Sequence, residues 1–248
     1  MKNNTLLAYL NKRMNKTRPV PAKERPLGPV ITISREVGCS GIAIAEDLAY
    51  RLNSRYPLHQ WKVLSKEIFR QSAQELDLDE ERVSKIFKQV DRTSFDELLN
   101  AFHEKRYKSD KKVRKTVVDV IRSFAEDGYC IIVGRASNVI AADIQNALHA
   151  RIVAPMDYRI SSIMKKNNLN RGEAIKFIEQ VEKERYAYRH AVMGKGQDAP
   201  EIFDITFNSA AFSREIILDM LMLAIDEKNI MADYISEVQP AGNVNSER

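Results

Sequence analysis

A short stretch ahead of the first predicted helix holds the residue types of an anion-binding loop. Gly38 and Gly41 give the backbone freedom that a tight loop needs. A helix is predicted to begin near Gly41, and a helix N-terminus presents free backbone N–H groups whose dipole favours an anion. Arg35 lies at the front of the loop, and Cys39 and Ser40 lie between the glycines. The pattern predicts a phosphate site built from Arg35, Gly38, Cys39, Ser40 and Gly41.

The loop lacks the side chains of a complete P-loop. The pattern G-x-x-x-x-G-K-[ST] needs a lysine for the β- and γ-phosphates and a hydroxyl for Mg²⁺. Ile42 and Ala43 follow Gly41 instead. The backbone half of a phosphate cradle is present, but an ordinary strand-to-helix turn would look the same. Both interpretations stay open on spacing alone.

The elements around the loop are typical of an α/β protein with a parallel sheet. Residues 30–33 form a short β-branched apolar run, which suits a strand buried on both faces. Apolar residues then recur at helical spacing over 41–53. Four further strands are predicted at 61–64, 129–133, 149–154 and 203–208. Ser213 is predicted to cap a last helix over 214–227, whose Ile216, Ile217, Met220, Leu221 and Leu223 are expected to face the sheet.

Arginines occur where ligands gather in such sheets. Gly134 and Arg135 follow the predicted strand 129–133, and ligands bind outside the carboxyl ends of the strands. An arginine there can hold a phosphate through two parallel hydrogen bonds, or it can pair with a carboxylate. The predicted helix 171–192 carries a basic stripe that includes Arg185 and Arg189, which could equally be surface charge.

The ordered set of segments resembles the cytidylate kinase-like family, a bacterial branch of the nucleoside monophosphate kinases. The resemblance covers roughly residues 29–227 and rests on the loop at 31–41, the strand and helix start at 61–68, I-I-V-G-R at 131–135, R-I-V-A-P at 151–155 with Arg159, and the segments 182–188 and 203–208. It implies a five-stranded parallel sheet flanked by helices, with a helical acceptor-binding insertion at about 65–127 and a helical lid at about 167–199. The kinase-like domain is expected over 29–229, between a basic flexible tail at 1–28 and a polar tail at 230–248.

The resemblance also implies roles for individual residues. Ser65, Lys66, Gly134 and Arg135 are expected to bind the acceptor, and the loop residues are expected to bind ATP. Arg159, Arg185 and Arg189 are expected to act in catalysis by neutralising charge on the transferred phosphoryl group. Ser65 stands where the family usually carries an aspartate, which leaves the acceptor's identity open.

The first hypothesis is therefore a phosphotransferase that uses ATP and Mg²⁺ to phosphorylate a nucleoside monophosphate, with cytidylate as the leading acceptor. The missing loop lysine, the missing hydroxyl and Ser65 favour a second hypothesis, a P-loop protein that binds nucleotide with little or no turnover. A third is a nucleic-acid module that uses the basic run 105–115. That run has only Tyr107 for stacking, so a solvated helix face is the favoured interpretation.

Composition and charge indicate the class of ligand and the cellular compartment. The 248 residues carry a net charge of +5, which suits anionic small ligands. Two cysteines, Cys39 and Cys130, make no disulfide framework, so a reducing cytoplasm is expected. No apolar run is long enough to span a bilayer and the N-terminus has no apolar core of a signal peptide, so no membrane partner is expected. The four histidines are scattered, and no metal-ligand spacing is found.

Overall fold

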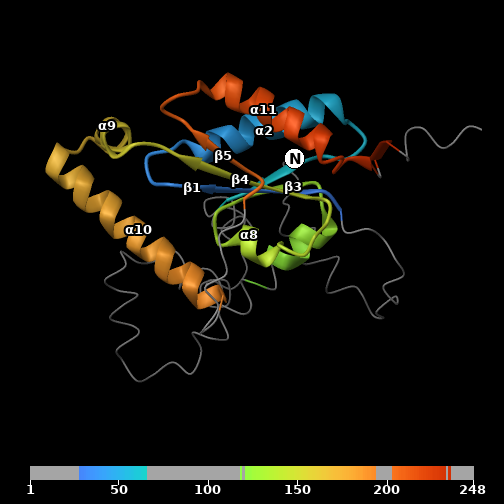
Figure 1. Cartoon of the computed structure of the whole chain (residues 1–248), viewed down its shortest axis with the longest axis horizontal. Coiled ribbons are helices and arrows are strands. Elements are labelled where there is room, and N and C mark those ends of the chain that lie inside the picture. The colour runs from blue at the N-terminus through green and yellow to red at the C-terminus, as the bar shows by residue number, and fades with distance from the viewer. Residues whose placement is uncertain (1–27, 66–117, 119–120, 194–202, 233, 236–248) are drawn as a thin grey trace, which may run out of the picture.

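The fold is a five-stranded parallel sheet with helices on both faces, as the sequence predicts. The computed structural model describes residues 28–65, 118, 121–193, 203–232, 234 and 235 (Figure 1). The strands are β1 (Val30–Arg35), β2 (Lys62–Leu64), β3 (Cys130–Val133), β4 (Ala147–Val153) and β5 (Ile205–Asn208). Their order is β2-β3-β1-β4-β5, and each neighbouring pair is parallel. β1 is therefore the central strand, and its carboxyl end lies between those of β3 and β4.

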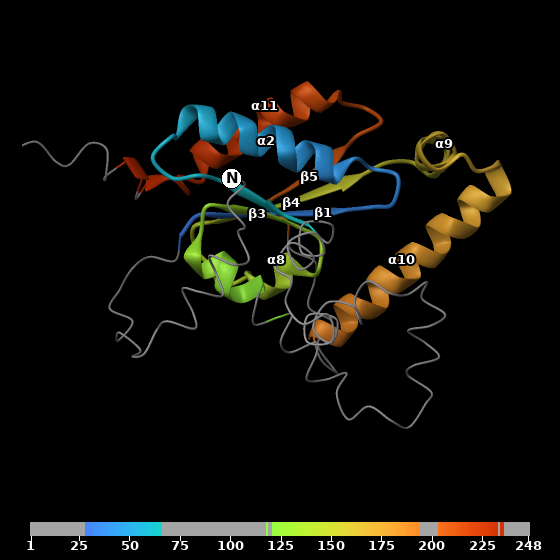
Figure 2. The same ribbon diagram turned by 180° about the vertical axis from the view of Figure 1, so that it is seen from behind.

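Two helical layers enclose this sheet. Helices α2 (Gly41–Arg55) and α11 (Arg214–Glu227) cover one face, and α8 (Ser137–Ile140) lies against the other (Figures 1 and 2). A hydrophobic cluster lies on each face of the sheet, and alternate residues of β1 pack into one or the other because successive strand side chains point to opposite faces. Ile31 and Ile33 pack in the cluster that includes α2 and α11, whereas Val30 packs in the cluster on the α8 side.

Two further helices extend beyond the carboxyl ends of the strands. α9 (Met156–Asn167) follows β4, and α10 (Arg171–Met193) runs back diagonally beneath the sheet (Figure 1). Pro155 stands directly before α9, at its N-cap position. A third apolar cluster joins Ile160 and Ile163 of α9 to Ala174 and Ile178 of α10. The two helices therefore pack against each other as a pair.

The last helix corrects one expectation. The Ser213 hydroxyl accepts a hydrogen bond from the Ile216 amide at 3.4 Å, which confirms the predicted cap. The buried stripe is Ile217, Leu218, Leu221 and Ile225. Ile216, Met220 and Leu223 are 45%, 38% and 60% exposed, so the expectation that they face the sheet is wrong. A helix turns by about 100° per residue, and α11 carries apolar residues on two stripes, only one of which can meet the sheet.

Other differences lie at element boundaries. β3 begins at Cys130 rather than at 129, because Tyr129 has a left-handed backbone with φ of +50°. Ile230, Met231 and Tyr234, which follow α11, are buried in the core, and the expected division of the chain into domains stays a prediction. Most of the expected insertion, the tail 1–27 and the basic run 105–115 lie outside the described residues. Within the described part of the chain, no helix is long and apolar enough to cross a membrane.

Candidate functional site

The loop between β1 and α2 has the conformation that its glycines predict. Gly38 has φ of +93°, and a Cβ added there would lie 2.8 Å from the Arg159 carbonyl oxygen, so α9 packs directly against it. The Gly41 amide turns back onto the Cys39 carbonyl oxygen at 2.8 Å. Ser40 precedes α2 without a side-chain capping bond. The Ile44 amide donates to the Ser40 carbonyl oxygen at 3.1 Å, so within the first turn of α2 the amides of Ile42 and Ala43 are the ones without an intrahelical acceptor, and an incoming anion or water can meet them.

Arg159 holds this loop in place from α9. Its side chain is 9% exposed, and its Nε donates to the Val37 carbonyl oxygen at 2.8 Å. Its Nη2 donates to Glu182 Oε1 at 2.8 Å, and its Nη1 lies 3.5 Å from Glu36 Oε2. These contacts brace the loop from within the protein. The catalytic role expected for Arg159 stays a prediction beside this bracing role.

Glu182 of α10 is a site residue that the sequence analysis did not single out. Its Oε1 accepts from the Val37 amide at 2.6 Å as well as from Arg159, and it lies 3.9 Å from Arg185 Nη1. One carboxylate thus joins the loop, α9 and α10. Its signal in the sequence was an acidic residue within the basic stripe of the helix, but its partners are far away along the chain.

The side chain of Arg35 lies between Gly134 and Gly41. A Cβ added to Gly134 would lie 1.9 Å from Arg35 Nη1, and one added to Gly41 would lie 3.0 Å from Arg35 Cγ. Gly134 and Gly41 therefore leave the space that the Arg35 side chain occupies. Arg185 Nη1 donates to the Arg35 carbonyl oxygen at 2.8 Å, which brings α10 to the carboxyl end of β1. Burial lowers the pKa of the Arg185 guanidinium below its usual value, and Glu182 opposes that shift.

Arg135 approaches the same space from β3. Gly134, Arg135 and Ala136 all have left-handed backbones, with φ of +78°, +58° and +53°, so the chain turns sharply where β3 ends. The Arg135 guanidinium carbon lies 5.6 Å from the centre of the Tyr188 ring on α10. Guanidinium groups stack on aromatic faces in this way. The contact links the end of β3 to the helix that also carries Arg185.

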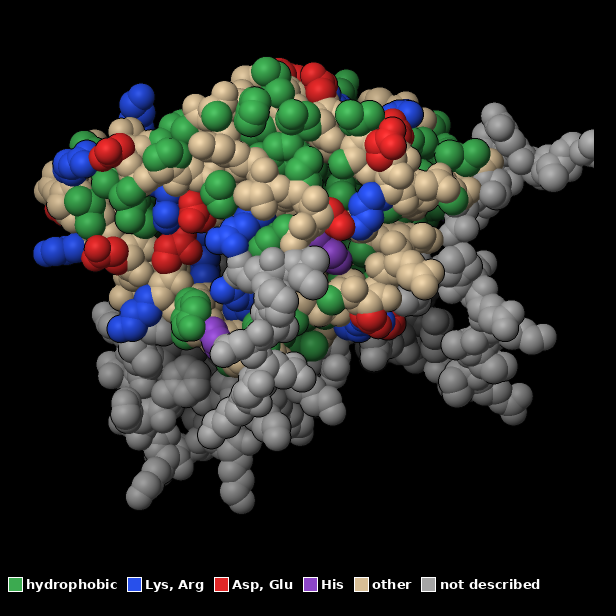
Figure 3. Space-filling view, in the orientation of Figure 1, with side chains coloured by type: hydrophobic (Ala, Val, Ile, Leu, Met, Phe, Trp, Pro, Cys, Tyr) green, Lys and Arg blue, Asp and Glu red, His purple; other side chains and the backbone are tan. Residues whose placement is uncertain are grey.

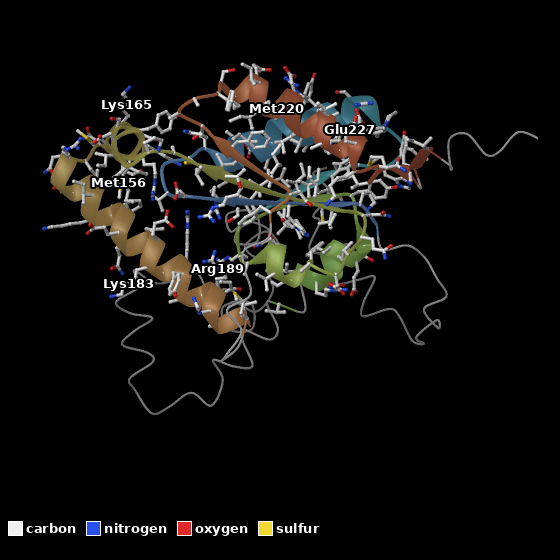
Figure 4. The ribbon with its side chains drawn as sticks, viewed as in Figure 1. Met156, Lys165, Lys183, Arg189, Met220 and Glu227 are labelled. Atoms are coloured by element: carbon white, nitrogen blue, oxygen red, sulfur yellow. The ribbon has the colours of Figure 1, made fainter. Side chains whose placement is uncertain are left out.

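Arg189 lies one turn beyond Arg185, beneath the sheet (Figure 4). Burial lowers the pKa of its guanidinium, and the charge of Arg151 on β4 lowers it further. Lys and Arg side chains gather between α10 and the sheet, with acidic side chains among them (Figure 3). Arg151 was quoted in the family resemblance but was not assigned a role. Its signal was a charged residue inside an otherwise apolar parallel strand.

The structure therefore brings most of the predicted residues together. Arg35 and Arg185 lie at the end of β1 beside the loop. Arg135 lies at the end of β3 against Tyr188 of α10, and Arg189 lies one turn further along α10. Ser65 follows β2, two strands away from β1, and is buried. Lys66 lies outside the described residues, so its role stays a prediction, as does that of Ser65.

Cys39 sits in the loop as a small buried side chain. Burial raises the pKa of its thiol, and a hydrogen bond with Ser209 partly opposes the shift. A thiol of raised pKa is a poor nucleophile. Among the residues that the structure describes, no cluster of three or more His, Cys, Asp or Glu side chains could hold a metal ion.

Known proteins resemble this chain to different extents. A model of the cytidylate kinase-like family matches residues 30–211. The crystal structure of an uncharacterized protein from Eubacterium ventriosum ATCC 27560 aligns with a TM-score of 0.57 at 19% identity, over 81% of this chain and 99% of that one. TT1252 from Thermus thermophilus aligns with a TM-score of 0.42 at 16% identity, over 80% and 97% of the two chains. A uronate isomerase of Corynebacterium glutamicum is 21% identical over 114 residues, which is 46% of this chain and 22% of the isomerase.

Proposed function

The chain belongs to the cytidylate kinase-like family, and from this premise we propose that it transfers a phosphoryl group from ATP to a nucleoside monophosphate. Cytidylate is the first acceptor to test. One observation carries the proposal: arginines from β1, β3 and α10 converge on the loop that begins α2. Two contacts support it: Arg185 donates a hydrogen bond to the Arg35 carbonyl oxygen at the end of β1, and Arg135 stacks on the Tyr188 ring of α10.

Each group has a part in this reaction. Phosphoryl transfer needs in-line positioning and neutralisation of charge more than covalent help from the protein. We assign the ATP polyphosphate, bound as its magnesium complex, to the amides at the start of α2. Arg35, which lies across Gly134, is the group that would replace the missing loop lysine. Arg185 and Arg189 would meet the charge that develops during transfer.

A second candidate function keeps the binding and loses the turnover. Ile42 and Ala43 occupy the positions of the lysine and hydroxyl of a complete P-loop. A protein with this loop would bind a nucleotide through its backbone and arginines while the reaction runs slowly or not at all.

A coupled assay of the purified chain distinguishes the two. ATP and Mg²⁺ are supplied with CMP, dCMP, UMP or AMP in turn, and product is identified by chromatography. Turnover with one acceptor supports the kinase, whereas saturable ATP binding without product from any acceptor supports the second function. We expect Arg135→Gln to lower the rate by about 100-fold, as removal of a charge-stabilising donor does. Arg171→Gln is the matched control, because Arg171 lies at the far end of α10 and pairs with Asp157.

A further inference from the structure

A carboxylate on α10 is held by donors of the kind that bind phosphate. Glu182 Oε1 accepts from the Val37 amide at 2.6 Å and from Arg159 Nη2 at 2.8 Å. The same oxygen lies 3.9 Å from Arg185 Nη1. A loop amide together with guanidinium groups is a donor set that proteins use for phosphate oxygens. The Glu182 carboxylate therefore acts as an internal anion at the loop between β1 and α2.

Glu182 belongs to the part of α10 that meets the loop through polar contacts. Ala174 and Ile178 are the buried residues of α10, and both lie in its first half, packed against α9. In the second half, Glu182 bonds to the loop and Arg185 bonds to the end of β1. Partly exposed polar contacts open at a lower free-energy cost than a buried apolar core does. The Glu182 side chain, which is 34% exposed, can thus leave the loop while the first half of α10 stays packed on α9.

Arg159 keeps its place on the loop without Glu182. Its Nε donates to the Val37 carbonyl oxygen at 2.8 Å, and its Nη1 lies 3.5 Å from Glu36 Oε2, a carboxylate of the loop itself. Arg185 depends more on Glu182, which is the group that most strongly opposes the lowering of the Arg185 pKa by burial. Displacement of Glu182 therefore leaves the Val37 amide and the Arg185 guanidinium to another anion.

We propose that Glu182 is an autoinhibitory anion, whose carboxylate competes with the phosphate ligand of the loop for the Val37 amide and the Arg185 guanidinium. The inference rests on the proposed function, which assigns a polyphosphate to this loop, and it adds a regulation of that site. A polyphosphate carries several negative charges and the carboxylate carries one, so the polyphosphate is attracted more strongly by the same guanidinium group. Glu182 thus holds α10 on the loop until a ligand of higher charge displaces it.

Calorimetric titration of the full chain with inorganic pyrophosphate tests the proposal. Glu182→Gln removes the charge, whereas Glu182→Asp keeps the charge on a side chain one methylene too short to reach the same donors. Competition predicts that both variants bind pyrophosphate more tightly. For Glu182→Gln we expect about tenfold, the lower end of what a hydrogen bond to a charged group contributes. Glu179→Gln is the matched control, because Glu179 is exposed one turn earlier on α10, and its affinity should stay within twofold.

Three results overturn the proposal. The first is an affinity of Glu182→Gln that is unchanged within twofold or lower, since a carboxylate that orients the arginines for the ligand would give a loss. The second is a rise in Glu182→Gln without one in Glu182→Asp, which is the pattern of charge repulsion without shared donors. The third is that the unsubstituted chain and both variants fail to bind pyrophosphate.

The titration is independent of turnover, so it separates this proposal from the kinase assignment. If both variants bind pyrophosphate more tightly while no acceptor is phosphorylated, the competition stands and the kinase fails. If the unsubstituted chain phosphorylates an acceptor while the affinities stay equal, the kinase stands and the competition fails. The melting temperature of each variant without ligand reports whether it is folded. If Glu182→Gln is not folded, Glu182→Asp decides: tighter binding than in the unsubstituted chain supports the proposal, and equal or weaker binding overturns it.

Discussion

Replacing Arg159 by methionine should destabilise the protein through the loop that it braces. Methionine keeps much of the apolar stem and removes the guanidinium. Glu36 and Glu182 then lose the positive charge between them, and the Val37 carbonyl oxygen loses its donor. Breaking a fully buried pair costs about 3–5 kcal/mol. Because the two carboxylates are 25% and 34% exposed, water can reach them, so we expect about 2–3 kcal/mol.

Urea unfolding followed by far-UV circular dichroism measures this loss. Arg159→Lys should recover part of it, because lysine keeps the charge but cannot donate to Val37 and Glu182 at once. Arg171→Met is the matched control, since its ion pair with Asp157 is 60% and 84% exposed and should be worth at most about 1 kcal/mol. If Arg159→Met and Arg171→Met lower the free energy of unfolding equally, Arg159 does not brace the loop and the reasoning fails.

Three further substitutions probe the same region and the sheet. Gly38→Ala should cost about 1–3 kcal/mol in urea unfolding, because φ is +93° and the new Cβ meets the backbone of Arg159 2.8 Å away; an unchanged midpoint would contradict this. Gly134→Ala should displace Arg35 and weaken ATP binding about tenfold or more, measured by calorimetry, and unaltered affinity would remove Arg35 from the site. Burial lowers the pKa of His149, with Lys228 adding to the shift and Asp204 opposing it, so the unfolded chain takes up a proton that the folded chain resists. The free energy of unfolding should therefore fall as the pH drops below about 6.5, by at most about 1.4 kcal/mol per unit, and His149→Asn should remove that part of the slope.

Local patterns were enough to predict the sheet, the loop and most helix boundaries. The β-branched run at 30–33, the two glycines before α2 and the Ser213 cap each act over a few residues. α11 shows the limit of this approach, because apolar residues on two stripes leave the buried one undetermined until the sheet is present. Ile216 and Met220 were assigned to the core for that reason and are exposed.

The site was harder to predict because its contacts are not local. The four arginines of the site were named from strand ends and from the family resemblance. Glu182 was not, because its importance comes from partners on other elements. The Val37 amide and the Glu182 carboxylate are 145 positions apart along the chain. No spacing rule within one helix or one strand contains that contact.

The hydrogen bond from Val37 to Glu182 makes one amide a reporter of helix movement. The acceptor belongs to α10, whereas the donor belongs to the loop at the end of β1. A separation of α10 from the sheet must expose that N–H to solvent, and amides exchange with deuterium only when they are exposed. The deuterium uptake of this single position, with and without nucleotide, therefore measures how often the helix leaves the loop.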